Sequence, residues 1–99
     1  MKVVIHFYGV VKNVVNAPIE TLELAFHSTL ADLLNILQEK YGTNFTNRVF
    51  DDQGRVLNFV RFFLNGEEMD NLKLNVPLAI KNGGITKLDI YILPAQVGG

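Results

Sequence analysis

Hydrophobic and polar residues alternate with a period of two in the first part of the chain. In residues 3–8 the odd positions are valine, isoleucine and phenylalanine, and the even positions are valine, histidine and tyrosine. Residues 19–26 alternate again, with leucine at 22 and 24 and phenylalanine at 26. Because successive side chains of a strand point to opposite faces, the pattern predicts two strands. The first has two largely apolar faces, and the second is expected to lie antiparallel to it across a connection at residues 9–18.

The period changes after residue 28, where a helical pattern begins. Thr29 can cap a helix, and Asp32 three residues later completes a capping box. Four leucines then follow at the i, i+3, i+4 and i+7 spacing of a stripe that packs on one side, namely Leu30, Leu33, Leu34 and Leu37. The pattern predicts a helix over residues 29–41 that ends at Gly42.

The second half of the chain is predicted to consist of strands and turns. Residues 44–58 are polar, and the sequence DDQGR at 51–55 is typical of a hairpin-like turn between two short apolar pairs. Residues 59–64 form an apolar strand that ends at Asn65-Gly66, a dipeptide that favours a tight turn. Residues 67–85 are expected to be irregular or an edge strand, since Pro77 and three residues at 82–84 interrupt their alternation.

Residues 87–93 complete the pattern as the last predicted strand. One helix among four or five strands indicates an α+β domain in which the helix packs across one face of the sheet. If the first and last strands pair in parallel at the centre, the arrangement is a β-grasp, the ubiquitin-like fold. The periodicity by itself indicates an α+β domain and does not show whether that domain is a β-grasp.

Composition narrows the possible functions. The chain has 99 residues, of which 48% are hydrophobic and 19% charged, as in a single globular domain. Its formal net charge of −1 gives no global field that would attract nucleic acid or an anionic membrane, and neither is an expected partner. There is no cysteine, which excludes disulfides, thiolate metal sites and cysteine nucleophiles. His6 and His27 lie far apart without neighbouring ligands, so no metal site is predicted.

The first residues and the hydropathy of the chain bear on its location. Residues 1–6 lack the basic region and the apolar stretch of a secretory signal peptide. No apolar run approaches the roughly 18 residues of a membrane span. We therefore expect a soluble, cytoplasmic protein.

Four stretches of the chain resemble, in the same order, the small subunit of molybdopterin synthase and the related MoaD/ThiS-like sulfur carriers. They are FYGVVKNVV at 7–15, STLADLLNIL at 28–37, FDDQGRVLNFVRFFLNGEEM at 50–69 and ILPAQVGG at 92–99. The resemblance implies a β-grasp with a mixed four- to five-stranded sheet and one main helix in a single domain at 1–93. Residues 94–99 are then a C-terminal tail that ends in Gly-Gly. The Asn82-Gly83-Gly84-Ile85 sequence departs from the acidic turn common in such carriers, and the 70–80 segment is longer than usual.

The resemblance also implies the chemistry of the tail. A terminal carboxylate has a pKa of about 3.5, so it is ionised and a poor electrophile at neutral pH. Conversion of the Gly99 carboxylate to a thiocarboxylate requires prior adenylation, and Gly98 has no side chain to obstruct a narrow active site. The chain has no phosphate-binding loop and no cysteine to relay sulfur. It is therefore expected to be a carrier and not an enzyme, with no bound cofactor, and ATP is used by an activating partner.

The expected partners are an E1-like adenylating enzyme and the large subunit of molybdopterin synthase. Six residues are candidates for contact with such partners, from the second face of the sheet and from the tail: Tyr8, Arg61, Phe63, Leu93, Pro94 and Val97. The acidic pairs at 51–52 and 67–68 are interpreted as solvated turns, since neighbours on a turn point apart.

Three other functions share this pattern. The protein could carry sulfur for thiamine synthesis or tRNA thiolation, or it could be a protein modifier joined to lysines through Gly99. Both use the same activated C-terminus, so the sequence does not separate them. The third is a β-grasp interaction module without C-terminal chemistry, which would keep its partner binding after deletion of Gly98-Gly99.

Overall fold

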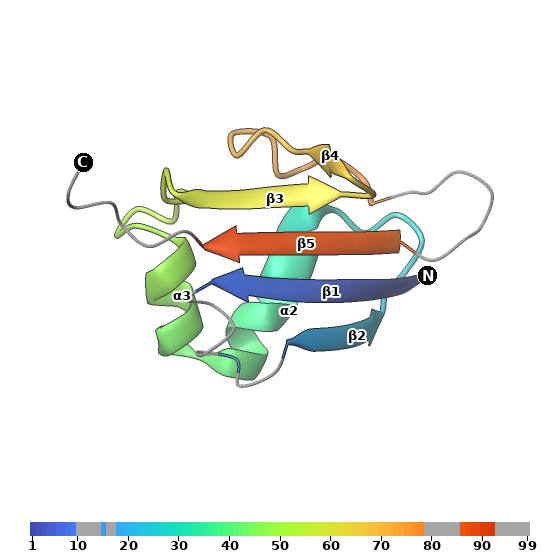
Figure 1. Ribbon diagram of the computed structural model, residues 1–99, viewed down its shortest axis with the longest axis horizontal. Coiled ribbons are helices and arrows are strands. Elements are labelled where there is room, and N and C mark those ends of the chain that lie inside the picture. Colours follow the sequence, from blue (N-terminus) through green and yellow to red (C-terminus); the bar gives the residue numbers. More distant parts are fainter. Residues whose placement is uncertain (10–14, 16–17, 79–85, 93–99) are drawn as a thin grey trace.

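The computed structural model describes residues 1–9, 15, 18–78 and 86–92 (Figure 1). Its elements in chain order are β1 (Lys2–Gly9), β2 (Ile19–Glu23), α2 (Leu30–Tyr41), α3 (Thr43–Val49), β3 (Val60–Leu64), β4 (Glu67–Glu68) and β5 (Thr86–Ile92). Within the part of the chain that is described, no helix is long and apolar enough to cross a membrane.

The strands form one mixed sheet in the order β2-β1-β5-β3-β4. The first and last strands, β1 and β5, pair in parallel at its centre, from Val3 opposite Thr86 to Gly9 opposite Ile92. The pairs β1–β2, β3–β5 and β3–β4 are antiparallel. Helix α2 crosses one face of the sheet (Figure 1). This is the β-grasp arrangement, and the predicted α+β fold is confirmed.

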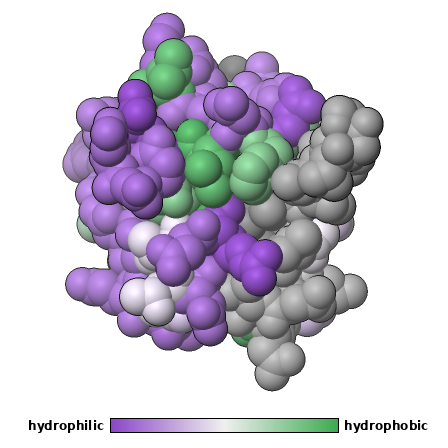
Figure 2. Space-filling model, turned by 90° about the vertical axis from the view of Figure 1, so that its left-hand side faces the viewer, coloured by the Kyte–Doolittle hydropathy of each residue, from purple (hydrophilic) through white to green (hydrophobic). Residues whose placement is uncertain are grey.

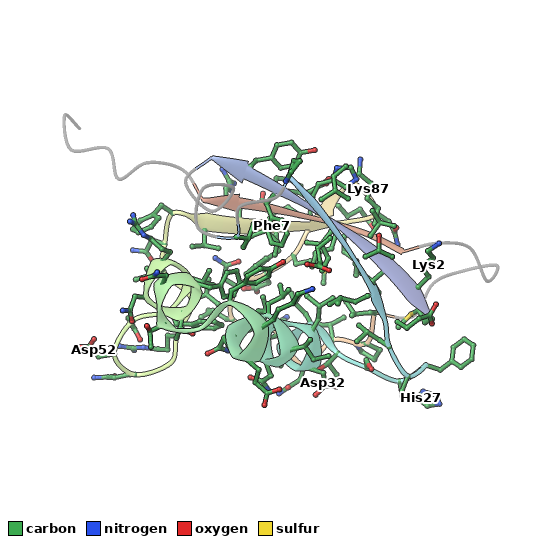
Figure 3. All side chains as sticks on the ribbon, turned by 90° about the horizontal axis from the view of Figure 1, so that it is seen from below. Lys2, Phe7, His27, Asp32, Asp52 and Lys87 are labelled. Atoms are coloured by element: carbon green, nitrogen blue, oxygen red, sulfur yellow. The ribbon has the colours of Figure 1, made fainter. Side chains whose placement is uncertain are left out.

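The core lies between the sheet and α2. The odd positions of β1 are buried there as predicted, and Figure 3 shows Phe7 pointing between the sheet and the helices. The four leucines of the α2 stripe are at most 1% exposed. Full burial of a leucine side chain contributes about 1.5–3 kcal/mol, so this stripe is a major part of what holds the helix on the sheet. The other strands contribute alternate positions, namely Val60, Phe62, Leu88 and Ile90.

The ends of α2 are those predicted from the sequence. The Asp32 N–H donates to the Thr29 hydroxyl at 3.1 Å, and the Thr29 N–H donates to the Asp32 carboxylate at 2.9 Å, which completes the capping box. Gly42 ends the helix with a φ of 75°, and its N–H donates to the carbonyl of Gln38. A positive φ is readily adopted by glycine, which explains the stop at this residue.

Two segments differ from the sequence prediction. The start of the polar stretch at 44–58, for which no helix was predicted, lies in the short helix α3, which is held by the burial of Phe45 and Val49 on the same side. The strand expected over 19–26 ends at Glu23, and Phe26 is 73% exposed. A turn starts at this point, because the Ser28 N–H donates to the Ala25 carbonyl at 3.1 Å.

The predicted turns are present. Phe50 and Val56 form an antiparallel bridge around the 51–55 turn. Asn65 and Gly66 have φ values of 51° and 88° and connect β3 to β4. The predicted irregular segment runs past the start of α2, where Pro77 bridges Thr29. The N–H groups of Leu30 and Ala31, in the first turn of α2, donate to the carbonyls of Val76 and Leu74. The segment therefore supplies acceptors for N–H groups that have no partner within the helix.

Candidate functional site

The sheet has a second face, opposite α2, which we call the outer face. Figure 1 views the molecule from this side, with α2 behind the strands. Figure 3 shows Lys87 on the side of the sheet away from the helices. The outer face comprises the alternate positions that do not enter the core, namely Lys2, Val4, His6, Tyr8, Ile19, Thr21, Glu23, Arg61, Phe63, Glu68, Lys87 and Asp89.

Strand pairing brings three of the predicted partner-binding residues together on the outer face. Tyr8 on β1 and Arg61 on β3 both lie opposite Tyr91, one on each side of β5. Phe63 lies opposite Asp89, one pleat further from the end of β5. These three residues therefore flank the last residues of the strand that leads into the C-terminal segment. The sequence alone does not predict that these three residues lie close together, because their proximity depends on the order of the strands in the sheet.

The other predicted site residues cannot be placed. Leu93, Pro94, Val97, Gly98 and Gly99 lie outside the described residues. Their assignment as tail contacts and as the reactive end stays a prediction. What the structure does describe is the base of this segment, which is the central strand β5 between β1 and β3.

Arg61 is oriented by an ion pair that sequence reasoning missed. Its guanidinium donates two hydrogen bonds to the Glu68 carboxylate, at 2.7 and 2.9 Å. The hydrogen bonds and charge of Glu68 raise the pKa of Arg61 above its usual value. Both side chains remain about half exposed. The acidic pair at 67–68 was predicted to lie on a solvated turn; it is exposed, but it forms strand β4, from which Glu68 orients Arg61 on β3.

His6 and Tyr8 form an aromatic pair beside β5. Their ring centroids lie 6.3 Å apart with an angle of 13° between the planes, so the two rings are roughly parallel. Both residues are partly buried, although α2 and α3 lie on the opposite side of the sheet. The outer face thus offers aromatic surface on β1 and on β3, where Phe63 is also partly buried.

Asp89 lies between these two aromatic groups and was not anticipated from the sequence. In the sheet it is opposite His6 on one side and Phe63 on the other. It is only 8% exposed, and its Oδ2 atom lies 3.9 Å from the Nζ atom of Lys87. The sequence contains one indication of this arrangement: the alternation of residues 87–91 places Asp89 and Lys87 on the same face of a strand.

Two cavities of the described structure lie on the helix side, and the predicted site residues do not line either of them. One, of about 460 Å³, lies between α2, α3 and the 51–55 turn, and a neighbouring one of about 400 Å³ lies along the same turn. Figure 2 shows this end of the molecule, where a small apolar area is bordered by polar side chains. Asp51 lines both cavities, but its carboxylate accepts hydrogen bonds from the N–H groups of Arg55 and Gln53. These bonds lower the pKa of Asp51 and hold the 51–55 turn together.

The charged groups that the structure describes do not form a metal centre. Across residues 1–9, 15, 18–78 and 86–92, no three histidine, aspartate or glutamate side chains are grouped so that they could hold a metal ion. The features that remain are the outer face and the strand that leads into the tail.

The fold is similar to that of small ubiquitin-like proteins of known structure. The crystal structure of small archaeal modifier protein 1 from Haloferax volcanii matches with a TM-score of 0.78 at 16% identity, over 96% of this chain and 98% of that one. The solution structure of small archaeal modifier protein 1 from Methanosarcina acetivorans matches with a TM-score of 0.71 at 14% identity, over 95% and 94% of the two chains.

A third similar structure is of a protein from Pyrococcus furiosus that is provisionally named molybdopterin converting factor, subunit 1. Its TM-score is 0.70 at 15% identity, over 95% of this chain and 99% of that one. No protein-family model and no curated protein matches the sequence. At these identities the structural likeness shows the shared β-grasp fold.

Proposed function

We propose that this protein is a sulfur carrier whose C-terminal glycine is activated by a partner enzyme. The observation that carries the proposal is the position of β5. It is the central strand of a β-grasp sheet, and the sequence LPAQVGG follows directly from it. The similarity of the fold, over nearly the whole chain, to modifiers and to a provisionally named molybdopterin converting factor subunit supports it.

In the proposed reaction, the partner supplies the catalytic groups. A carboxylate oxygen of Gly99 attacks the α-phosphorus of ATP, and pyrophosphate leaves. Hydrosulfide then attacks the acyl carbon of the adenylate, AMP leaves with the electrons of the broken C–O bond, and the thioacid loses its proton. The product is a thiocarboxylate on Gly99. The protein contributes the reacting carboxylate and a narrow path for it, because Gly98 and Gly99 have no side chains.

The outer face is the proposed docking surface for the partner. Tyr8, Arg61 and Phe63 flank the end of β5, so a partner seated there would lie beside the start of the tail. From residue 95 to residue 99 an extended chain reaches on the order of 17 Å, enough to enter a neighbouring active site. Leu93, Pro94 and Val97 are proposed to contact the entrance.

We propose molybdopterin synthesis as the destination of the sulfur. The partners would then be an adenylating enzyme and the large subunit of molybdopterin synthase. Support comes from the sequence resemblance and from the similar Pyrococcus furiosus structure. Thiamine synthesis and tRNA thiolation would use the same thiocarboxylate and a different acceptor.

A second candidate function is protein modification, which the two similar modifier structures favour. The activated Gly99 would then react with a lysine amine and form an isopeptide bond. Both functions require the same adenylate, so they differ only in the nucleophile that receives the acyl group.

The test combines the protein with ATP, a sulfide source and the adenylating enzyme encoded in the same genome, followed by intact mass measurement. The expected result is replacement of one oxygen by sulfur. The matched control is a variant that lacks Gly98 and Gly99, which should not change in mass. An unmodified mass, under conditions that thiolate a known carrier, would contradict the proposal. Isopeptide adducts on other proteins, with no thiocarboxylate, would favour the modifier function.

A further inference from the structure

The carboxylate of Asp89 is nearly buried on the outer face, although neither of the described helices α2 and α3 covers that face. The residue is 8% exposed, and it belongs to the central strand β5. Its Oδ1 atom is closed to solvent and has no hydrogen-bond partner among the described residues. The atom is therefore a buried acceptor without a donor in the part of the chain that the structure describes.

An unsatisfied buried charged oxygen is costly. Its transfer out of water is compensated only when hydrogen bonds replace those to water, so most buried polar atoms in native proteins have a partner. The nearest cation does not supply one. The Nζ atom of Lys87 lies 3.9 Å from Oδ2, too far for a hydrogen bond, and half of the Lys87 side chain is exposed.

The surroundings of Asp89 restrict what could satisfy it. Neighbouring strands lie about 4.8 Å apart, so the residues opposite Asp89, His6 on β1 and Phe63 on β3, are its nearest lateral neighbours. The other cation nearby, Arg61, already donates two hydrogen bonds to Glu68. None of these described neighbours donates to Oδ1 in the structure, so a docked partner could supply the donor, between His6 and Phe63.

We propose that Asp89 receives an arginine side chain of the adenylating enzyme when that enzyme docks on the outer face. This inference rests on the proposed function and names one contact of the same surface. A guanidinium group is planar, weakly hydrated and always charged, so it can enter a narrow site between aromatic rings and donate two hydrogen bonds to one carboxylate. A lysine ammonium holds its water more strongly and suits such a site less well.

Docking then exchanges an unfavourable feature of the free protein for a favourable contact in the complex. The half-exposed Lys87 side chain can move aside, and the carboxylate can turn toward the entering guanidinium, because the last torsion of an aspartate side chain is broad. Asp89 therefore lowers the stability of the free protein and raises its affinity for the adenylating enzyme. Substitution of a binding residue of this kind should raise stability and lower affinity, whereas substitution of a purely structural residue should lower both.

The first experiment measures ATP–pyrophosphate exchange by the adenylating enzyme as a function of carrier concentration. Asp89→Asn keeps the shape of the side chain and removes its charge. We expect the KM for the carrier to rise about tenfold or more, with kcat unchanged, because a contact in the docking surface has been lost. Asp52→Asn is the matched control. It removes the same charge from an exposed turn on the helix side (Figure 3) and should leave KM unchanged.

The second experiment measures the stability of the free protein. Asp89→Val replaces the carboxylate by an apolar side chain that suits a strand, and the melting temperature is expected to rise by a few degrees. A melting temperature that falls would overturn the inference, because the carboxylate would then be satisfied in the free protein. An Asp89→Asn variant with the KM of the original protein would overturn it as well.

The two levels of the proposal fail in different ways. If the original protein supports no exchange at all, the proposed function is wrong, and the inference that rests on it falls too. If the original protein and Asp89→Asn support exchange equally well, the proposed function stands and the assignment of Asp89 is wrong.

Discussion

The hydroxyl of Tyr41, the last residue of α2, donates a hydrogen bond to the carboxylate of Glu20 on β2. The same carboxylate accepts a hydrogen bond from Lys40 Nζ at 2.8 Å. Glu20 lies opposite Ile5 and therefore points to the helix side of the sheet. The two contacts join the edge strand β2 to the end of the helix. Burial, the hydrogen bond to Glu20 and the charge of Glu20 raise the pKa of Tyr41 to about 12.

Removal of the Tyr41 hydroxyl is expected to change both stability and its dependence on alkaline pH. Tyr41→Phe should lower the free energy of unfolding at neutral pH by about 1.5–3 kcal/mol, the usual contribution of a hydrogen bond to a charged group. In the original protein the pKa of Tyr41 is higher when folded than when unfolded. Its contribution is therefore complete below about pH 10 and declines toward pH 12.

Urea unfolding at neutral pH and at about pH 9 and about pH 11 measures this effect. The difference in stability between the original protein and Tyr41→Phe should shrink over the alkaline range. A difference that stays constant between these two alkaline pH values would show that the hydroxyl does not stabilise the fold through its protonated form.

Glu20 is expected to stabilise the fold at neutral pH and to lose this effect in acid. Burial alone would raise the pKa of Glu20, but the hydrogen bonds from Lys40 and Tyr41 and the charge of Lys40 lower it overall. A lowered pKa in the folded state means that the stabilisation is complete above the unfolded pKa of about 4.3 and declines as the pH falls through the folded value. Glu20→Gln should therefore be less stable than the original protein near neutrality.

Thermal unfolding followed by circular dichroism from about pH 7 to about pH 3 checks this sign. The gap in melting temperature between the two proteins should narrow as the pH falls. Glu39→Gln, on an exposed position of α2, controls for the loss of one acidic charge. A gap that widens in acid would contradict the assignment of the lowered pKa to Glu20.

The capping box at the start of α2 is expected to contribute measurably to stability. Thr29→Ala removes the acceptor for the Asp32 N–H and should lower the free energy of unfolding by about 1 kcal/mol. Thr29→Ser keeps the hydroxyl and should retain most of the stability. Denaturant unfolding of both variants measures the contribution. Equal destabilisation by serine and alanine would mean that the hydroxyl is not what matters at this position.

Arg61 is predicted to act in docking and to contribute little to stability. Its ion pair with Glu68 is about half exposed, and exposed pairs contribute roughly 0–1 kcal/mol. Arg61→Ala should therefore unfold close to the original protein, whereas its KM as a carrier in ATP–pyrophosphate exchange should rise several-fold. Arg55→Ala, which breaks the exposed pair with Asp51 on the helix side, is the matched control. A KM that rises equally in both variants would indicate a general charge effect instead of a specific contact.

The local elements of this protein could be predicted from short stretches of its sequence. The leucine stripe and the capping box each depend on residues within a few positions of one another, and the structure contains both as predicted. The same holds for the Asn65-Gly66 turn, whose residues adopt positive φ values. The short helix α3 escaped prediction because two buried side chains, Phe45 and Val49, are too few to show a period.

The neighbours of each residue on the outer face could not be predicted in this way, because they depend on the order and register of the strands. Alternation places Glu20 on the same side of β2 as the apolar Leu22, but its partner is at the far end of a helix. In the same way, Asp89 is one polar residue in an apolar strand until β1 and β3 pair on either side of it and bury its carboxylate. The physical reason is that strand pairing joins segments far apart in the chain, and the environment of a side chain on a central strand is made by its neighbours on the strands beside it.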